Sequence, residues 1–200
     1  TAAGEVQSLG GFLFTPEGIG QIGTNGIFVV SHTFASPIVG TGLLQRWTYA
    51  YLEDTAYFCH PSIGIRKYDS TGWTNVDVGL ANPQAITVAN SRLQVLTLTV
   101  HGWSAPGEPE NFTPALGGAG FVTIDQHVTG KPQVLVGLPQ AVLIWTDSAG
   151  LVAEFTGEDG VYRHYPLEHD YRPLSDTAIA RIASGSYIMC TTQGLYQQNI

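Results

Sequence analysis

The segment LIWTDSAGLVAEF (143–155) places two apolar stretches on either side of a short polar turn that ends at Gly150. Short apolar runs bounded by turn-forming residues are typical of buried β-strands and differ from the 3.6-residue period of a helix. Similar stretches recur four more times. They are FLFTPEGIGQI (12–22), YFCHPSIGIRKY (57–68), LTLTVHGWS (96–104) and YIMCTTQGLYQQ (187–198). The sequence therefore predicts five copies of one β-hairpin unit.

Each copy contains a glycine that follows a polar residue at the end of its first strand. These turn-pivot glycines are Gly18, Gly64, Gly102, Gly150 and Gly194. Their mean separation is 44 residues, which matches the period of a four-stranded propeller blade. We expect each glycine to lie in a tight turn with positive φ, where a side chain would cost free energy. Chance spacing among 24 glycines is the alternative.

Further strand candidates precede the last four hairpins, at 46–52, 84–89, 133–138 and 177–183. The predicted fold is all-β: one propeller-like domain over residues 1–200, with about five antiparallel blades of three or four strands. Only 17 residues precede Gly18, so we expect the first unit to be incomplete. An incomplete blade exposes a strand edge that a partner protein can cover.

The composition limits the classes of function. The 8 basic and 16 acidic residues give a net charge of -8, which would repel a nucleic acid backbone. No apolar run approaches the 18 residues that span a bilayer, and the N-terminus lacks the pattern of a secretory signal, so no membrane partner is expected. The charged fraction of 12% and the 24 glycines favour a protein rich in strands and turns.

Nucleophiles and metal ligands do not form a recognisable site in the sequence. Cys59 and Cys190 occupy the same position of two repeats as Trp145 does in a third, which favours burial over a disulfide or metal ligation. The six histidines show no helical i, i+4 pair, and no G-x-S-x-G turn is present. We therefore expect no catalytic residue, no metal and no cofactor.

Two alternative functions stay open at this point. Some five-bladed propellers are glycoside hydrolases with carboxylates at the central channel. The candidate acids are Asp54, Asp69, Asp125, Asp147 and Asp170. A carbohydrate-binding protein would instead use aromatic rings as sugar platforms. The candidates are Trp47, Trp73, Trp103 and the nine tyrosines, although such rings also pack between blades.

The stretch from Asn90 to Asp125 resembles a recurring segment in β-propeller proteins of tailed-bacteriophage virions. The resemblance rests on Trp103-Ser104, on Gly107-Glu108-Pro109 and on Phe112, and residues 141–157 look like the next blade of those proteins. It implies a non-enzymatic structural protein of the virion, in the tail, the neck or a genome-stabilising component.

The resemblance also implies the partners, which are other virion proteins and copies of the chain itself. DNA passing through a channel without tight binding is compatible with the acidic surface. We therefore expect a virion protein that assembles through its β surfaces around the particle axis.

Overall fold

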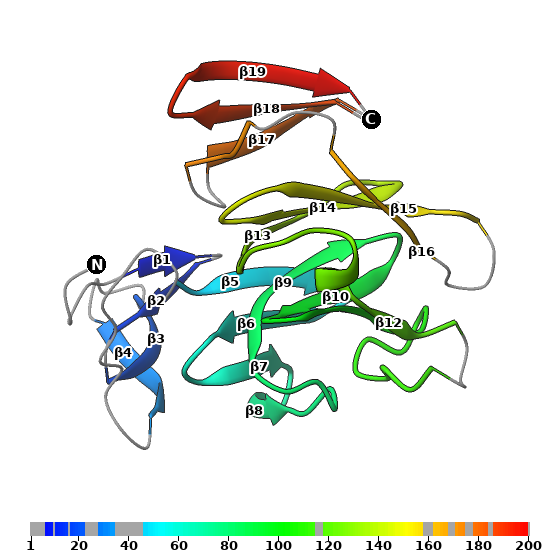
Figure 1. Ribbon diagram of the computed structural model, residues 1–200. Coiled ribbons are helices and arrows are strands. Elements are labelled where there is room, and N and C mark those ends of the chain that lie inside the picture. The colour runs from blue at the N-terminus through cyan, green and yellow to red at the C-terminus, as the bar shows by residue number, and fades with distance from the viewer. Residues whose placement is uncertain are drawn as a thin grey trace.

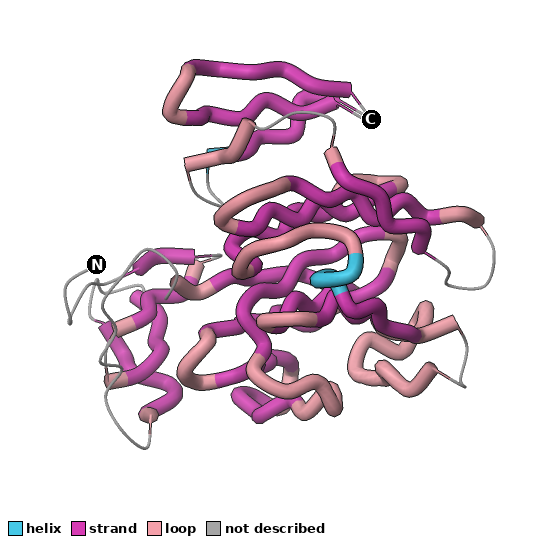
Figure 2. Tube along the Cα trace, in the orientation of Figure 1, coloured by secondary structure: helices cyan, strands magenta, loops and turns pink. Residues whose placement is uncertain are grey.

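The computed structural model describes ten segments of the chain. They are residues 7–9, 11–15, 17–22, 28–34, 46–114, 118–157, 162–167, 171–174, 178–183 and 186–199. Strands dominate these segments, and Ile124–Gln126 forms a short 3-10 helix, η1 (Figure 2). The predicted all-β class is confirmed.

The strands form five antiparallel sheets, each made of consecutive strands. The first sheet contains β1 (Gln7–Leu9), β2 (Phe12–Phe14), β3 (Gly18–Ile22) and β4 (Phe28–Thr33). The second contains β5 (Thr48–Leu52), β6 (Thr55–His60), β7 (Gly64–Asp69) and β8 (Gly72–Val76). The third contains β9 (Pro83–Ala89), β10 (Arg92–Thr97), β11 (Val100–Trp103) and β12 (Gly120–Thr123). The fourth contains β13 (Pro132–Gly137), β14 (Ala141–Thr146), β15 (Gly150–Phe155) and β16 (Tyr162–Pro166), and the fifth contains β17 (Ile179–Ala183), β18 (Ser186–Thr191) and β19 (Gly194–Asn199).

The repeated hairpin is present in every sheet. It joins the second strand to the third, as β2–β3, β6–β7, β10–β11, β14–β15 and β18–β19 (Figure 1). The four upstream strands predicted from the sequence correspond to β5, β9, β13 and β17. Short apolar runs bounded by turn-forming residues were therefore sufficient to place the repeat.

The expectation of an incomplete first unit is wrong. The first sheet has four strands, whereas the fifth has three among the described residues. A complete upstream strand fits before the first hairpin because β1 and β2 have only three residues each, and Gly11 turns the chain between them at φ 84°. The smallest described sheet is therefore at the other end of the series.

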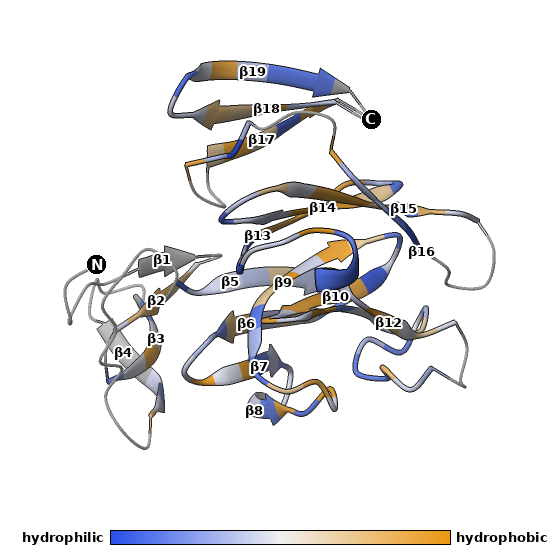
Figure 3. Ribbon diagram, viewed as in Figure 1, coloured by the Kyte–Doolittle hydropathy of each residue, from blue (hydrophilic) through white to orange (hydrophobic). Residues whose placement is uncertain are grey.

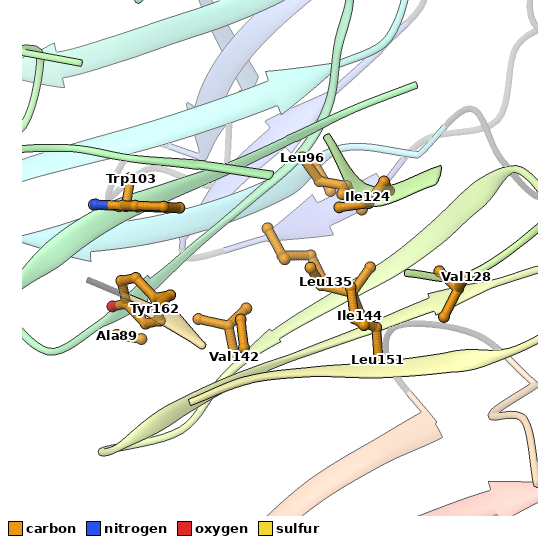
Figure 4. Close-up of a cluster of buried hydrophobic side chains, with 12 residues drawn as sticks. Ala89, Leu96, Trp103, Ile124, Val128, Leu135, Val142, Ile144, Leu151 and Tyr162 are labelled. Carbon is orange, nitrogen blue, oxygen red and sulfur yellow. The ribbon is translucent and has the colours of Figure 1, made fainter. Parts of the chain in front are cut away.

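Apolar clusters fill the space between successive sheets. The ring of Phe14 lies 4.5 Å from that of Trp47, between the first and second sheets. The largest cluster lies between the third and fourth sheets and includes Trp103, Ile144 and Tyr162 (Figure 4). Two further clusters join the second sheet to the third and the fourth to the fifth. The core is thus a series of layers between blades.

The first strands of the middle sheets lie side by side along the inner edge of this series. β9 contacts both β5 and β13. Thr48 Oγ1 accepts a hydrogen bond from the Ile86 backbone N–H at 2.9 Å, and Thr87 Oγ1 accepts one from the Gly137 N–H at 3.1 Å. Each threonine hydroxyl therefore connects its sheet to the next one, and the register between neighbouring inner strands is fixed by a polar contact.

The turn-pivot glycines do not share one conformation. Gly64 and Gly194 begin β7 and β19 with φ of 84° and 136°. Gly18 and Gly150 begin β3 and β15 without positive φ, and a side chain there would meet the His32 carbonyl and the Trp145 ring respectively. Gly102 lies inside β11, where a Cβ would meet the Leu80 side chain. Three of the five positions therefore need glycine for close packing and not for backbone conformation.

A polar residue at the end of the second strand closes each hairpin instead. In the third sheet Thr97 Oγ1 accepts hydrogen bonds from the N–H groups of Thr99 and Val100, so Gly102 is not needed in the turn. The same role is filled in the other sheets by Thr15, His60, Thr146 and Thr191. Threonine side chains commonly accept a hydrogen bond from the backbone N–H two or three residues later in a turn.

The five sheets follow an open arc. In Figure 1 the first sheet lies at the left and the fifth at the top, with the middle sheets between them. Each described apolar cluster joins sheets that follow one another in the chain, and none joins the first sheet to the fifth. Each end sheet therefore has one neighbour sheet in the described part of the chain.

Candidate functional surfaces

A groove of about 430 Å³ opens between the first and second sheets. Its lining combines aromatic, acidic and small side chains. They belong to Phe12, Tyr51, Asp54, Ala56, Tyr68, Asp69 and Ser70. We refer to these seven residues as the groove.

The walls of the groove come from one row of side chains across the second sheet. Tyr51 on β5 pairs with Ala56 on β6, which pairs with Tyr68 on β7. Residues paired across antiparallel strands point to the same face, so the two tyrosines flank the small alanine. Phe12 of the first sheet closes one side, with its ring centroid 5.1 Å from that of Tyr68.

Turns at the ends of these strands bring two carboxylates to the groove. Asp54 lies in the β5–β6 turn and Asp69 ends β7. Asp69 Oδ1 accepts hydrogen bonds from the backbone N–H and hydroxyl of Thr71, at 2.8 and 2.6 Å. These bonds, with the charge of Lys67 Nζ at 3.9 Å, lower the pKa of Asp69. The groove therefore keeps negative charge at neutral pH.

A second surface is the outer face of the fifth sheet, formed by Ile188, Cys190 and Leu195. Tyr187 and Met189 point the other way and pack against the fourth sheet. Ile188 and Cys190 alternate with them along β18, and Cys190 pairs with Leu195 on β19. Leu195 is 76% exposed, and Figure 3 shows this apolar start of β19 in orange.

The equivalent positions of the fourth sheet are covered by a neighbouring sheet. Leu143 and Trp145 are the third and fifth residues of β14, as Ile188 and Cys190 are of β18. Leu143 and Trp145 are buried, because the fifth sheet covers them. The outer face of the fifth sheet thus has apolar residues at the positions that, in the fourth sheet, pack against the next sheet.

A third feature is a buried group of histidines between the third and fourth sheets. His101 on β11 is fully buried, and its Nδ1 lies 3.0 Å from Nε2 of His164 on β16. The exposed His127 stacks on His164 at 5.4 Å between ring centroids. Because His127 and His164 stack, their nitrogens do not converge on one point. Among the described residues no group of three or more histidine, cysteine or acidic side chains is placed to hold a metal.

The five candidate acids do not come together at a channel. Asp54 and Asp69 share the groove, whereas Asp125 lies in η1 and Asp147 in the β14–β15 turn, where its carboxylate accepts the Lys131 N–H at 2.9 Å. Asp170 lies outside the described residues. Three of the four described acids therefore hold turns or line the groove, and they form no common centre.

The candidate tryptophans and cysteines are mostly structural. Trp47 and Trp103 are buried between sheets, so neither offers the exposed ring face that a sugar platform needs. Trp73 is half-buried and donates to Ser31 Oγ at 2.8 Å. Cys59 is fully buried and Cys190 partly so, and both are free thiols. The most exposed aromatic rings of the described chain belong instead to the tyrosines of β5 and to Phe121 of β12.

The groove was missed in the sequence although a signal for it exists. Alternation along the second hairpin places Tyr51, Ala56 and Tyr68 in one row once the turn lengths are known. The histidine pair has no such signal, because 63 residues separate His101 from His164 and only the stacking of two sheets joins them.

The chain matches no family of known proteins and no curated protein sequence. Its fold is similar to solved propeller structures. The WD40 domain of Pan2 from Neurospora crassa superposes with a TM-score of 0.63 at 7% identity, over 98% of this chain and 61% of that one. YCF48 bound to D1 peptide gives 0.61 at 11% identity, over 98% and 62%. The fold is propeller-like.

A designed protein, Ika8, is also similar, with a TM-score of 0.57 at 12% identity over 97% of this chain and 57% of that one. The chain thus spans about three-fifths of the length of these three structures. At such low identities the likeness extends to the fold alone. No helix among the described residues is long and apolar enough to span a bilayer.

Proposed function

We propose that this chain is a non-enzymatic structural protein that assembles with further copies of itself through the outer face of its fifth sheet, as a tail or neck component of a phage virion. The observation that carries the proposal is the exposure of Leu195, beside Ile188 and Cys190, at positions where the fourth sheet is covered. Leu143 and Trp145 are covered by the fifth sheet, which is the next copy of the same repeated unit. A sheet of a second copy is therefore the occupant that fits.

Burial of this face would supply a useful part of the association free energy. Complete burial of one leucine or isoleucine side chain contributes about 1.5–3 kcal/mol. Leu195 alone retains most of its surface for such a contact, and the neighbouring Ile188 and Cys190 are partly exposed. The neighbouring Gln193 and Gln197 are uncharged, so these two side chains add no local repulsion to that between the net charges of two copies.

The virion setting rests on the resemblance of residues 90–125 and 141–157 to propeller proteins of phage particles. These residues include β10, β11 and β12 of the third sheet and the central strands β14 and β15 of the fourth. The net charge of -8 suits a protein near a DNA passage, because repulsion allows DNA to slide. Detection of the chain in ring-symmetric copies inside a particle, by electron cryomicroscopy, tests this setting.

Carbohydrate binding is the second candidate function, and the tyrosine-walled groove is the surface that favours it. Its two carboxylates suit a cation better than a neutral sugar, so it ranks second. A glycan array with no hits would remove it. Glycoside hydrolysis has less support, because a general acid needs a raised pKa and that of Asp69 is lowered.

The self-association proposal is tested by a charge placed on the outer face. In sedimentation velocity, Leu195→Arg should shift the protein from oligomer to monomer, because the buried face would hold an unpaired charge. Leu98→Arg is the matched control, since Leu98 is 48% exposed and lies in the third sheet's hairpin. A monomeric unmodified chain at high concentration, or equal effects of both substitutions, would contradict the proposal.

A further inference from the structure

We propose that the groove binds the arginine side chain of a protein partner. The groove lies on the first and second sheets, and the proposed assembly surface lies on the fifth. The two surfaces can therefore be tested separately, and either proposal can fail without the other.

The groove has the dimensions of a slot for one flat group. Neighbouring strands lie about 4.8 Å apart, so the Cα atoms of Tyr51 and Tyr68 are separated by about 10 Å across Ala56. Ala56 itself is only 5% exposed, so a ligand would lie above it, between the outer parts of the two phenol side chains. Phe12 adds an apolar surface beside Tyr68. Such walls can hold the aliphatic stem and the flat face of a guanidinium group.

The charge of the groove selects a cation. Asp54 and Asp69 both line it, and hydrogen bonds from Thr71 keep Asp69 in its ionised form. Arginine meets such a site with two properties at once, because its planar group stacks on aromatic rings and its N–H groups donate in pairs to a carboxylate. The overall charge of -8 further raises the local concentration of cationic ligands.

The basic residues of the second sheet neutralise this site only in part. Lys67 Nζ lies 2.6 Å from Glu110 of the third sheet and 3.9 Å from Asp69. Arg66 directs Nη1 to its neighbouring carbonyl, that of Ile65, at 3.1 Å. Among the described residues no ion pair includes Asp54. A ligand cation therefore meets at least one carboxylate that lacks a basic partner in the described chain.

Arginine is favoured over the other ligands that such a groove admits. The lysine ammonium is compact and strongly hydrated, so it gains less from two aromatic walls. A neutral sugar stacks on tyrosine but gains no charge attraction from Asp54 or Asp69. Binding of arginine should therefore weaken with added salt, whereas binding of a sugar should not.

The probe for this proposal is N-acetyl-arginine methylamide, titrated into the full 200-residue chain and followed by backbone amide NMR shifts. We expect saturable shifts at Ala56, Ser70 and their neighbours, with a Kd on the order of millimolar, as suits one side chain in an open groove. The corresponding lysine derivative should bind at least about threefold more weakly. Methyl β-glucoside is the sugar arm and should give no saturable shifts.

Two pairs of substitutions locate the site. Tyr51→Leu removes a ring face and should weaken arginine binding about two- to fivefold. Phe121→Leu is the control, because Phe121 lies on β12 of the third sheet with 50% exposure against 51% for Tyr51, outside the groove lining. Asp54→Asn should weaken binding by a similar factor, and the neighbouring Glu53→Gln should not. Matching thermal unfolding curves show that each variant is folded.

Three results would overturn the proposal. One is saturable sugar binding without arginine binding, which would assign the groove to a carbohydrate. Another is a set of arginine-induced shifts spread over the acidic surface, which would indicate non-specific attraction. The third is an equal loss in Phe121→Leu or Glu53→Gln, since neither residue lines the groove.

Discussion

Nδ1 of His101 and Nε2 of His164 lie 3.0 Å apart and join the third sheet to the fourth inside the core. The amide of Gln94 decides which nitrogen carries the proton. Its Nε2 donates to the Ala89 carbonyl and to Tyr162 Oη, so its Oε1 faces His101 Nε2 at 3.1 Å. His101 must therefore donate from Nε2 and accept at Nδ1 while it is neutral, and His164 donates from Nε2.

This arrangement predicts that acid destabilises the protein. Burial, reinforced by the charge of His127, lowers the pKa of His164 to about 4, although a hydrogen bond to the Tyr162 backbone opposes that shift. Burial also lowers the pKa of His101 well below its usual value. The unfolded chain, with a histidine pKa near 6.5, then binds more protons than the folded chain. The free energy of unfolding should be highest above pH 6.5 and fall between pH 6.5 and pH 4, by about 3 kcal/mol from His164.

Urea unfolding at pH 7, 5.5 and 4 measures this loss. His164→Gln should remove the contribution of His164 to the pH dependence and leave that of His101, because glutamine does not titrate and its amide can still donate to His101. His127→Gln is the second variant to measure. Removal of a neighbouring positive charge should raise the pKa of His164, so the free energy of unfolding should fall less between pH 7 and pH 4. An unchanged pH profile in His164→Gln would show that other groups cause the acid sensitivity.

A second prediction concerns the close approach of β9 and β13. A Cβ at Gly137 would collide with the backbone carbonyl of Val88, which cannot rotate away as a side chain can. Gly137→Ala should therefore lower the free energy of unfolding by about 3 kcal/mol. Thr87→Val, which removes only the hydrogen bond to the Gly137 N–H, should cost about 1 kcal/mol.

Gly79→Ala is the matched control for that substitution. Gly79 has φ 70° and no atom near its missing Cβ, so alanine there meets backbone strain but no collision. Its cost should be about 1–2 kcal/mol. If chemical denaturation gives Gly137→Ala and Gly79→Ala the same loss, the sheets can separate enough to admit a methyl group.

The hairpin repeat was predictable because strand alternation and turn residues are local properties. The residues that close each turn were harder to predict. Glycine was the visible marker in the sequence, but Thr97 and Thr146 close their turns through side-chain hydrogen bonds, and Gly150 serves packing. The completeness of the first sheet escaped prediction because the three residues Gln7–Leu9 are too few to show a period.

The candidate sites depend on which sheets meet, and a repeat of 44 residues does not determine this. Asp54 and Asp69 were among five acids with equal claims, and only the fold places them in one groove with Tyr51. Trp103 and Trp145 likewise pack between sheets, and no local pattern encodes which neighbouring sheet each of them contacts.

A third prediction uses the two cysteines as reporters of assembly. Burial raises the pKa of the Cys59 thiol far above its usual value, so Cys59 should not react with a thiol reagent while the protein is folded. Cys190 is partly exposed on the outer face of the fifth sheet and should react. If a second copy covers that face, labelling of Cys190 should slow as the protein concentration rises, whereas Leu195→Arg should keep it fast. Mass spectrometry of the labelled peptides distinguishes the two thiols, and a Cys190 labelling rate that is independent of concentration in an oligomeric sample would place the interface elsewhere.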